Sequence, residues 1–243
     1  PFPGDSICIF KPTTKKYQYL KKDLGYFQGG AAGDINKDGN ADILAYSGGS
    51  KLVPIHPTAY INNGNLNFQL QNNLFKGFSN TTDDNYYTLE LFDLTGDGFL
   101  DLCLGGRNRL RIVPYNNGIF NRKEAISINV SLGYEVLDLL FLDFDEDGKL
   151  DILALTNKNG YQGYALKLYL NRGSQYLEVT QEYFDKSEEN GLDSWIKWIR
   201  LFDYDKDGDM DIVADGLHGP LFNKKTTLHW KNNFGYFVMT RNN

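Results

Sequence analysis

The sequence predicts an all-β fold made of four-stranded antiparallel meanders that repeat along the chain. Four similar acidic loops have their first aspartates at residues 34, 93, 143 and 203, so they begin 59, 50 and 60 residues apart, which indicates a repeat architecture. Short apolar segments flank each loop. The chain is also rich in aromatic residues (14%) and contains 25 glycines, a composition that favours short strands joined by tight turns over helices.

The first strand of each repeat ends near the first aspartate of its acidic loop. These four segments read GYFQGGAAGD, YYTLELFD, EVLDLLFLD and WIKWIRLFD. The first repeat departs from the others because glycine and alanine stand where they have bulky side chains.

The second strand follows each loop and is almost continuously apolar. The four segments read ADILAYS, LDLCLGG, LDILALTN and MDIVADG. Strands that are apolar on both faces must be covered on both sides, so we expect these strands to lie inside the domain.

The third strand of each repeat alternates between apolar and polar residues. In RLRIVPYNNG, Leu110 and Ile112 share one face, while Arg109 and Arg111 share the other. In ALKLYLNRG, the leucines at 166, 168 and 170 share a face in the same way. This pattern predicts a third strand that is half exposed.

A tight turn and an aromatic fourth strand complete each repeat. The turns read NNGN at residue 62, NNG at 116, NRG at 171 and NNFG at 232, and asparagine and glycine tolerate the positive φ that hairpin turns need. The fourth strands then begin with aromatic residues: Phe68, Phe120, Tyr176, Tyr236 and Phe237.

Stacked radially, such meanders form a β-propeller. The predicted units span residues 25–73, 86–128, 135–183 and 195–240, and residues 6–20 have the pattern of the last two strands of a further unit. Four complete units plus a half unit leave three alternatives open. The chain is an excerpt of a larger propeller, a five-bladed ring with one thin blade, or a four-bladed ring with an extra hairpin.

The acidic loops have the spacing of a calcium site. Oxygen ligands at positions one, three, five and nine, a glycine at six and a backbone carbonyl at seven enclose a hard cation, and no histidine or cysteine lies in these loops. The predicted side-chain ligands are Asp34, Asn36, Asp38 and Asp42; Asp93, Thr95, Asp97 and Asp101; Asp143, Asp145, Asp147 and Asp151; and Asp203, Asp205, Asp207 and Asp211. The predicted carbonyl ligands belong to Asn40, Phe99, Lys149 and Asp209.

The same loops also account for much of the chain's acidity. Fourteen of the 31 acidic residues are predicted side-chain ligands, three in each of the first two loops and four in each of the last two. The net charge of −6 is therefore attributed to metal binding, with up to four Ca²⁺, and is poor evidence for a basic partner. The carboxylate count ranks the loops at 143 and 203 above the other two in affinity. The alternative is an aspartate-rich turn without metal.

The pattern DxDxDGxxD between two strands, followed by an apolar strand and an NNG hairpin, resembles the FG-GAP/VCBS repeats of integrin-α-type propellers. The resemblance covers residues 6–240, with departures at Thr95 and in GGAAG. It implies a calcium-binding propeller that acts as an adhesion module, a lectin or, less often, a polysaccharide lyase. EF-hands and dockerins have similar loops, but there a helix follows the loop. The resemblance also implies an extracytoplasmic, secreted or cell-surface location.

No other motif in the sequence indicates catalysis. His56, His218 and His229 lie in separate repeats, and no nucleophile elbow, phosphate loop or basic aromatic cluster for nucleic acid occurs. No apolar stretch is long enough to insert into a membrane. We therefore expect a binding module for a glycan or an extracellular protein. The alternative is an accessory or catalytic propeller of a polysaccharide-degrading enzyme.

Several individual residues carry further expectations. Trp195, Trp198 and Trp230 are interpreted as core residues, and Cys8 and Cys103 as buried thiols. The connections at residues 76–85 and 185–194 join one repeat to the next, and loops on a rigid scaffold are where recognition usually occurs.

Overall fold

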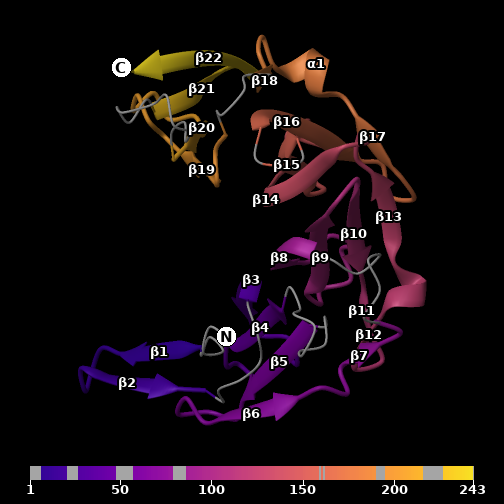
Figure 1. Cartoon of the computed structure of the whole chain (residues 1–243), viewed down its shortest axis with the longest axis vertical. Helices are drawn as coiled ribbons and strands as arrows, with labels where there is room; N and C mark the ends of the chain where they lie inside the picture. The colour runs from indigo at the N-terminus through magenta and orange to yellow at the C-terminus, as the bar shows by residue number, and fades with distance from the viewer. Residues whose placement is uncertain are drawn as a thin grey trace. The chain divides into compact units, whose positions relative to one another are not determined.

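The computed structural model describes residues 7–20, 27–47, 57–78, 86–158, 160, 162–189, 195–215 and 227–242. This part of the chain is all-β, as predicted, and forms several mainly antiparallel sheets (Figure 1). Its helical content is limited to a one-turn α-helix, α1 (Thr180–Tyr183), and a 3-10 turn, η2 (Arg122–Glu124). No helix among the described residues is long and apolar enough to cross a membrane.

Four sheets contain the four repeats. The first consists of β3 (Phe27–Gly33), β4 (Asp42–Ser47), β5 (Pro57–Asn62) and β6 (Phe68–Gln71). The second consists of β8 (Tyr86–Phe92), β9 (Asp101–Gly106), β10 (Arg109–Val113) and β13 (Ile126–Asn129). The third consists of β14 (Tyr134–Leu142), β15 (Asp151–Lys158), β16 (Gln162–Asn171) and β17 (Tyr176–Glu178), with β18 (Glu188–Glu189) paired to β16. The fourth consists of β19 (Ile199–Phe202), β20 (Asp211–Ala214), β21 (Thr227–Asn233) and β22 (Tyr236–Asn242).

Every acidic loop joins the first and second strands of its sheet, as the sequence predicts. In the third sheet, Leu142 at the end of β14 pairs with Asp151 at the start of β15, and in the fourth, Phe202 pairs with Asp211. Each pair closes the loop at its base. The ninth-position aspartate is thereby fixed in the first ladder position of the second strand.

The second repeat differs from the predicted meander. Phe120 lies in β12 (Ile119–Asn121), which pairs with β11 (Tyr115–Asn116) and, in parallel, with β7 (Phe75–Lys76), so it does not begin the fourth strand. The ring of Phe120 is fully buried and stacks on Phe75, with 5.7 Å between the ring centroids. Burial of this aromatic residue in a separate small sheet leaves β13 to form the fourth strand.

The third strands are less exposed than predicted. Of β5, β10 and β16, only β10 alternates as expected, with Leu110 and Ile112 buried and Arg109 and Arg111 half-buried. All six residues of β5 are buried, and in β16 Ala165 and Tyr169 are buried although they lie on the face opposite the leucines. The prediction of half-exposed third strands is therefore wrong for these two repeats.

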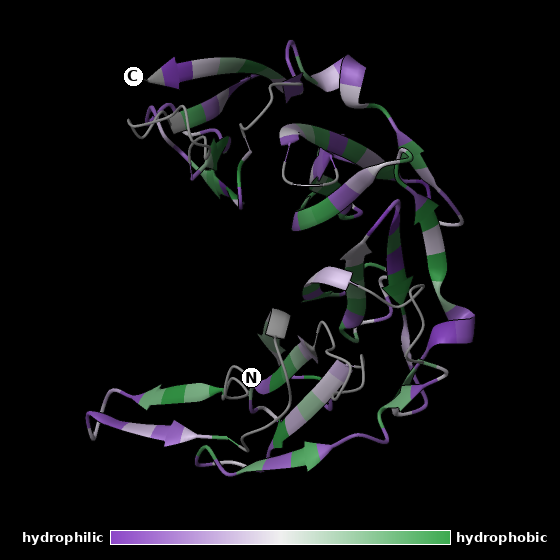
Figure 2. Ribbon diagram, viewed as in Figure 1, coloured by the Kyte–Doolittle hydropathy of each residue, from purple (hydrophilic) through white to green (hydrophobic). Residues whose placement is uncertain are grey.

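The predicted half unit is a two-stranded hairpin of β1 (Cys8–Lys11) and β2 (Lys16–Tyr19). Hydrophobic residues dominate β1 and hydrophilic ones β2 (Figure 2). Cys8 is exposed, so its prediction as a buried thiol is wrong, because among the described residues only β2 pairs with this strand. Cys103, in the second sheet, is fully buried as predicted.

The chain divides into two compact units, each with its own core. One contains residues 1–93, 97–104 and 112–125, and its core includes Tyr46, Tyr86 and Phe120. The other contains residues 94–96, 105–111 and 126–243, and its core includes Leu166 and Trp230.

The three tryptophans have different environments. Trp230 is fully buried, as predicted, and its indole N–H donates to the carbonyl of Lys186 at 2.8 Å. Trp198 is 38% exposed and stacks against Arg200, so its prediction as a core residue is wrong. Ile196 and Ile199 occupy the buried positions of this segment instead, and Trp195 is half-buried.

The glycines of β3 have a packing role. A Cβ built on Gly29 would lie 2.9 Å from the backbone nitrogen of Leu89 in β8, closer than real Cβ contacts come. The lack of a side chain therefore allows β3 to approach β8, which explains why this repeat lacks the bulky residues of the others.

Gly29→Val is expected to destabilise the fold by about 1–3 kcal/mol, because the backbone of β8 must move to admit the new side chain. Urea unfolding measures the loss. The control is Ala32→Val, which enlarges an exposed position in the same strand. Equal effects of the two substitutions would show that the close contact with β8 is unimportant.

Candidate metal centres

The four acidic loops share one backbone geometry. The glycine at position six has a positive φ in every loop, 87° at Gly39 and 86° at Gly148, for example. Position four is also left-handed in every loop, although three of the four residues there, Lys37, Glu146 and Lys206, are not glycine. The sequence predicts the positive φ at position six from its glycine. It does not predict the left-handed conformation at position four, because lysine and glutamate have no preference for it.

The first aspartate of the loop receives two backbone hydrogen bonds. In the loop at 143, the N–H groups of Asp147 and Gly148 donate to Oδ1 and Oδ2 of Asp143 at 3.0 and 2.8 Å. The loops at 34 and 93 repeat both contacts at 2.8–3.1 Å. The side chain of the first aspartate therefore holds the turn in shape.

The fifth-position aspartate caps the next turn. Its Oδ1 accepts the backbone N–H of the seventh residue in all four loops, at 2.8–3.0 Å. Hydrogen bonds lower the pKa of three of these aspartates. The main cause at Asp38 is the side-chain amide of Asn40, and at Asp147 it is the ammonium of Lys149. At Asp207 the main cause is the backbone N–H of Asp209. These bonds are those of aspartate turns, so the shape of the loop alone does not require a metal.

The ninth-position aspartate is buried in every loop. Both carboxylate oxygens of Asp151 accept backbone N–H groups, from Phe144 at 2.8 Å and from Asn171 at 2.7 Å. Asp42 and Asp211 make the same pair of bonds in their repeats, at 2.8–3.0 Å. This aspartate therefore links the loop, the second strand and the start of the hairpin after the third strand. Burial raises the pKa of Asp42 and Asp151.

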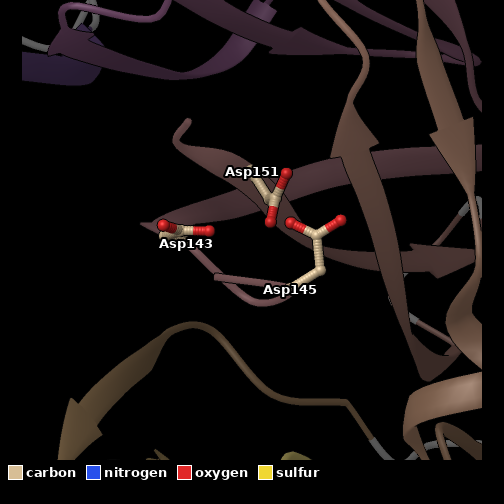
Figure 3. Close-up of side chains that lie close together, drawn as sticks. All are labelled: Asp143, Asp145 and Asp151. Atoms are coloured by element: carbon tan, nitrogen blue, oxygen red, sulfur yellow. The ribbon is translucent and has the colours of Figure 1, made fainter. Parts of the chain in front are cut away.

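Three carboxylates converge in each of the last two loops. Carboxylate oxygens of Asp143, Asp145 and Asp151 lie within 4.8 Å of one another, and Figure 3 shows these three side chains gathered at the loop. The same positions converge in the fourth repeat, at Asp203, Asp205 and Asp211.

One oxygen in each of these groups is buried without a hydrogen bond. These oxygens are Oδ1 of Asp145 and Oδ1 of Asp203. A buried carboxylate oxygen without a partner is costly, and a cation among the three carboxylates would supply one. The residues present therefore fit a hard cation, and these clusters could hold a metal ion.

The remaining predicted ligands are not brought together in this way. Asn36 and Thr95 hold the third position of the first two loops, and the amide of Asn36 donates to Asp38 at 3.0 Å. The described residues include no cluster of three acidic side chains in either loop. Their ligand sets, and the carbonyl ligands of all four loops, stay predictions.

His229 is the one histidine among the described residues, and it belongs to no metal-binding cluster there. His229 is buried, its ring lies 4.0 Å from that of Tyr204, and burial lowers its pKa. His56 and His218 lie outside the described residues, as does much of the two connections expected to carry recognition.

Comparison with solved structures shows similarity in fold. A complex of exo-β-1,3-galactanase from Phanerochaete chrysosporium with β-1,3-galactotriose matches with a TM-score of 0.54 and 9% identity, covering 99% of this chain and 53% of the galactanase. Its complex with galactose matches with a TM-score of 0.52 and 10% identity, covering 94% and 52%. The chain thus spans about half the length of these structures. An N-acetylglucosamine-recognising lectin from Agrocybe aegerita matches with a TM-score of 0.40 and 19% identity, covering 86% and 64%, which is too weak a likeness to use.

Sequence comparison identifies the repeat. No curated protein matches the chain. The model of the FG-GAP-like repeat matches residues 34–104, 93–154 and 143–214, and each match begins at the first aspartate of one acidic loop and runs beyond the next. Together these matches span most of the chain, which therefore belongs to the family of proteins with FG-GAP-like repeats.

Proposed function

We propose that this chain is a calcium-stabilised β-propeller module, or a section of one, that binds a glycan or a protein partner outside the cytoplasm. The observation that carries the proposal is the convergence of three carboxylates in the loops at 143 and 203, with one buried oxygen unpartnered in each. All these donors are oxygens, and the loop spacing is the one expected for Ca²⁺, whereas Mg²⁺ requires a stricter octahedron and retains several waters.

The arrangement of strands supports the proposal of blades. Each repeat provides antiparallel strands in sequence order, with the acidic loop between its first two strands. Neighbouring sheets also share a core within each compact unit. We infer that the four units are blades, at residues 25–73, 86–128, 135–183 and 195–240, and that β1 and β2 belong to a further blade.

Calcium chemistry supports the proposed location. We assign to these short, mostly exposed loops the dissociation constants of calcium sites in extracellular modules, about 10⁻⁴–10⁻³ M. Sites of this strength fill where calcium is abundant, as it is outside cells. We therefore propose a secreted or cell-surface module.

A surface cavity beside β13 and β17 provides a candidate binding site for a sugar. Its volume is about 350 Å³, and its lining includes Asn129, Tyr169, Gln175, Tyr176 and Glu178. The hydroxyl of Tyr169 is buried without a hydrogen-bond partner. Amide, hydroxyl and carboxylate groups beside aromatic rings can bind the hydroxyl groups and the apolar face of a sugar ring.

Gln175→Ala and Tyr176→Ala are each expected to weaken glycan binding by about tenfold, a loss of about 1.4 kcal/mol. Binding is measured by calorimetry with glycans selected from a panel in the presence of calcium. Likeness to the galactanase extends to fold alone, so β-1,3-galactan is only the first ligand to test.

The control variant is Gln181→Ala, which removes an exposed glutamine of α1 that does not line the cavity. If no glycan binds, a protein partner becomes the better hypothesis. If new reducing or unsaturated ends form during incubation, the chain belongs to a polysaccharide-degrading enzyme and the binding-module proposal is wrong.

A further inference from the structure

We propose that Arg172 and Lys231 are internal counter-cations of the loops at 143 and 203, which neutralise the carboxylates in the absence of calcium and compete with calcium for them. The inference rests on the proposed function, because it concerns the regulation of the same sites. It assigns a role to two side chains that lie outside the loop motif and are not ligands.

Arg172 reaches the loop of its own repeat. Its Nη1 lies 2.5 Å from Oδ2 of Asp145 and 3.4 Å from Oδ2 of Asp147. It directly follows Asn171, whose backbone N–H is hydrogen-bonded to Asp151. The hairpin that anchors the ninth-position aspartate therefore also delivers a positive charge to positions three and five.

Lys231 makes the equivalent contacts in the fourth repeat. Its ammonium is paired with Asp205 and lies 3.3 Å from Oδ2 of Asp207. Lys231 directly precedes Asn232, whose N–H is hydrogen-bonded to Asp211. The two basic residues thus lie on opposite sides of equivalent asparagines and reach the same two loop positions.

The first repeat has no such residue beside its asparagine. The neighbours of Asn62 are Ile61 and Asn63, and the nearby Lys37 lies over the ring of Phe99, 3.7 Å from its centre. Both loops with four predicted carboxylate ligands therefore have an internal cation. This charge offsets the extra carboxylate, so a carboxylate count alone overstates the calcium affinity of the last two loops.

Lys149 is a further cation in the loop at 143, where its ammonium lies 2.6 Å from Oδ2 of Asp147. Asp147, which Lys149 contacts, is not one of the three converging carboxylates. Arg172 contacts Asp145, which is one of them. We therefore assign the competition with calcium to Arg172 in this loop.

The test is calcium titration by calorimetry of the whole chain and of Arg172→Gln and Lys231→Gln. Each substitution is expected to strengthen calcium binding at its own loop by about two- to tenfold, because a partly exposed ion pair no longer has to be broken. Arg172→Lys keeps the charge and is expected to bind like the parent. The matched control is Lys167→Gln, which removes one positive charge from β16 at a residue paired with Glu178 at 3.1 Å and not with a loop.

Melting temperature provides a second readout. In chelator, Arg172→Gln is expected to melt below the parent, since its carboxylates have lost their counter-charge, and calcium is expected to raise its melting temperature by a larger increment. Unchanged or weaker affinity in both glutamine variants, or an equal gain in Lys167→Gln, would overturn the inference. Failure of the parent chain to bind calcium at all would instead refute the proposed function, and this inference with it.

Discussion

Removal of calcium is expected to lower the melting temperature by about 6–11 °C. Each site held at ten times its dissociation constant adds about 1.4 kcal/mol of stability, and for a chain of this size 1 kcal/mol corresponds to about 2–4 °C. Without calcium, only the side chains of Arg172 and Lys231 would offset the repulsion between the converging carboxylates of the last two loops. The estimate counts only these two loops, so binding at the other two would enlarge the effect.

The measurement is thermal unfolding in excess chelator, with calcium and with magnesium in separate samples. Calcium is expected to restore the full melting temperature and magnesium only part of it, because magnesium requires a stricter geometry. An unchanged melting temperature in chelator would show that the loops are aspartate turns that need no metal.

Replacement of Asp151 by asparagine is expected to cost about 2–4 kcal/mol even in chelator. Both oxygens of this buried carboxylate accept backbone N–H groups, and an amide would direct its own NH₂ at one of those donors. One buried donor is then left without a partner, at a cost of about 1–3 kcal/mol, and the charge that strengthens the other bond is lost.

Comparison with Asp147→Asn separates the structural role of Asp151 from its role in metal binding. Asp147 belongs to the same loop but is exposed, so its replacement is expected to have little effect on urea unfolding in chelator. Both variants are expected to lose part of the stabilisation by calcium. Equal stability of the two variants in chelator would contradict the role of Asp151 as a buried link between loop and hairpin.

The sequence predicts the fold well where a local pattern determines it. The four loops, the strands on either side of them and the glycine at position six all follow from short motifs with strong backbone preferences. The burial of Cys103 and Trp230 also follows from apolar strand patterns.

Features that depend on distant segments could not be predicted in this way. Phe120 leaves the meander because it stacks on Phe75, 45 residues away, and Gly29 is needed because β8 passes close to it. The contacts of Arg172 and Lys231 arise only when a hairpin more than twenty residues away folds against the loop. The hydrogen bond from Asn171 to Asp151 has a similar origin, because the two residues lie 20 positions apart, and no local signal in the sequence identifies it.

The most direct test of the central claim is to count the calcium ions bound to the intact chain by native mass spectrometry. The parent is expected to bind up to four ions in millimolar calcium. A variant with both Asp143→Asn and Asp203→Asn is expected to lose the ions of the two loops in which carboxylates converge. Absence of bound calcium in the parent, or the same number of ions in the variant, would contradict the proposal that these loops are calcium sites.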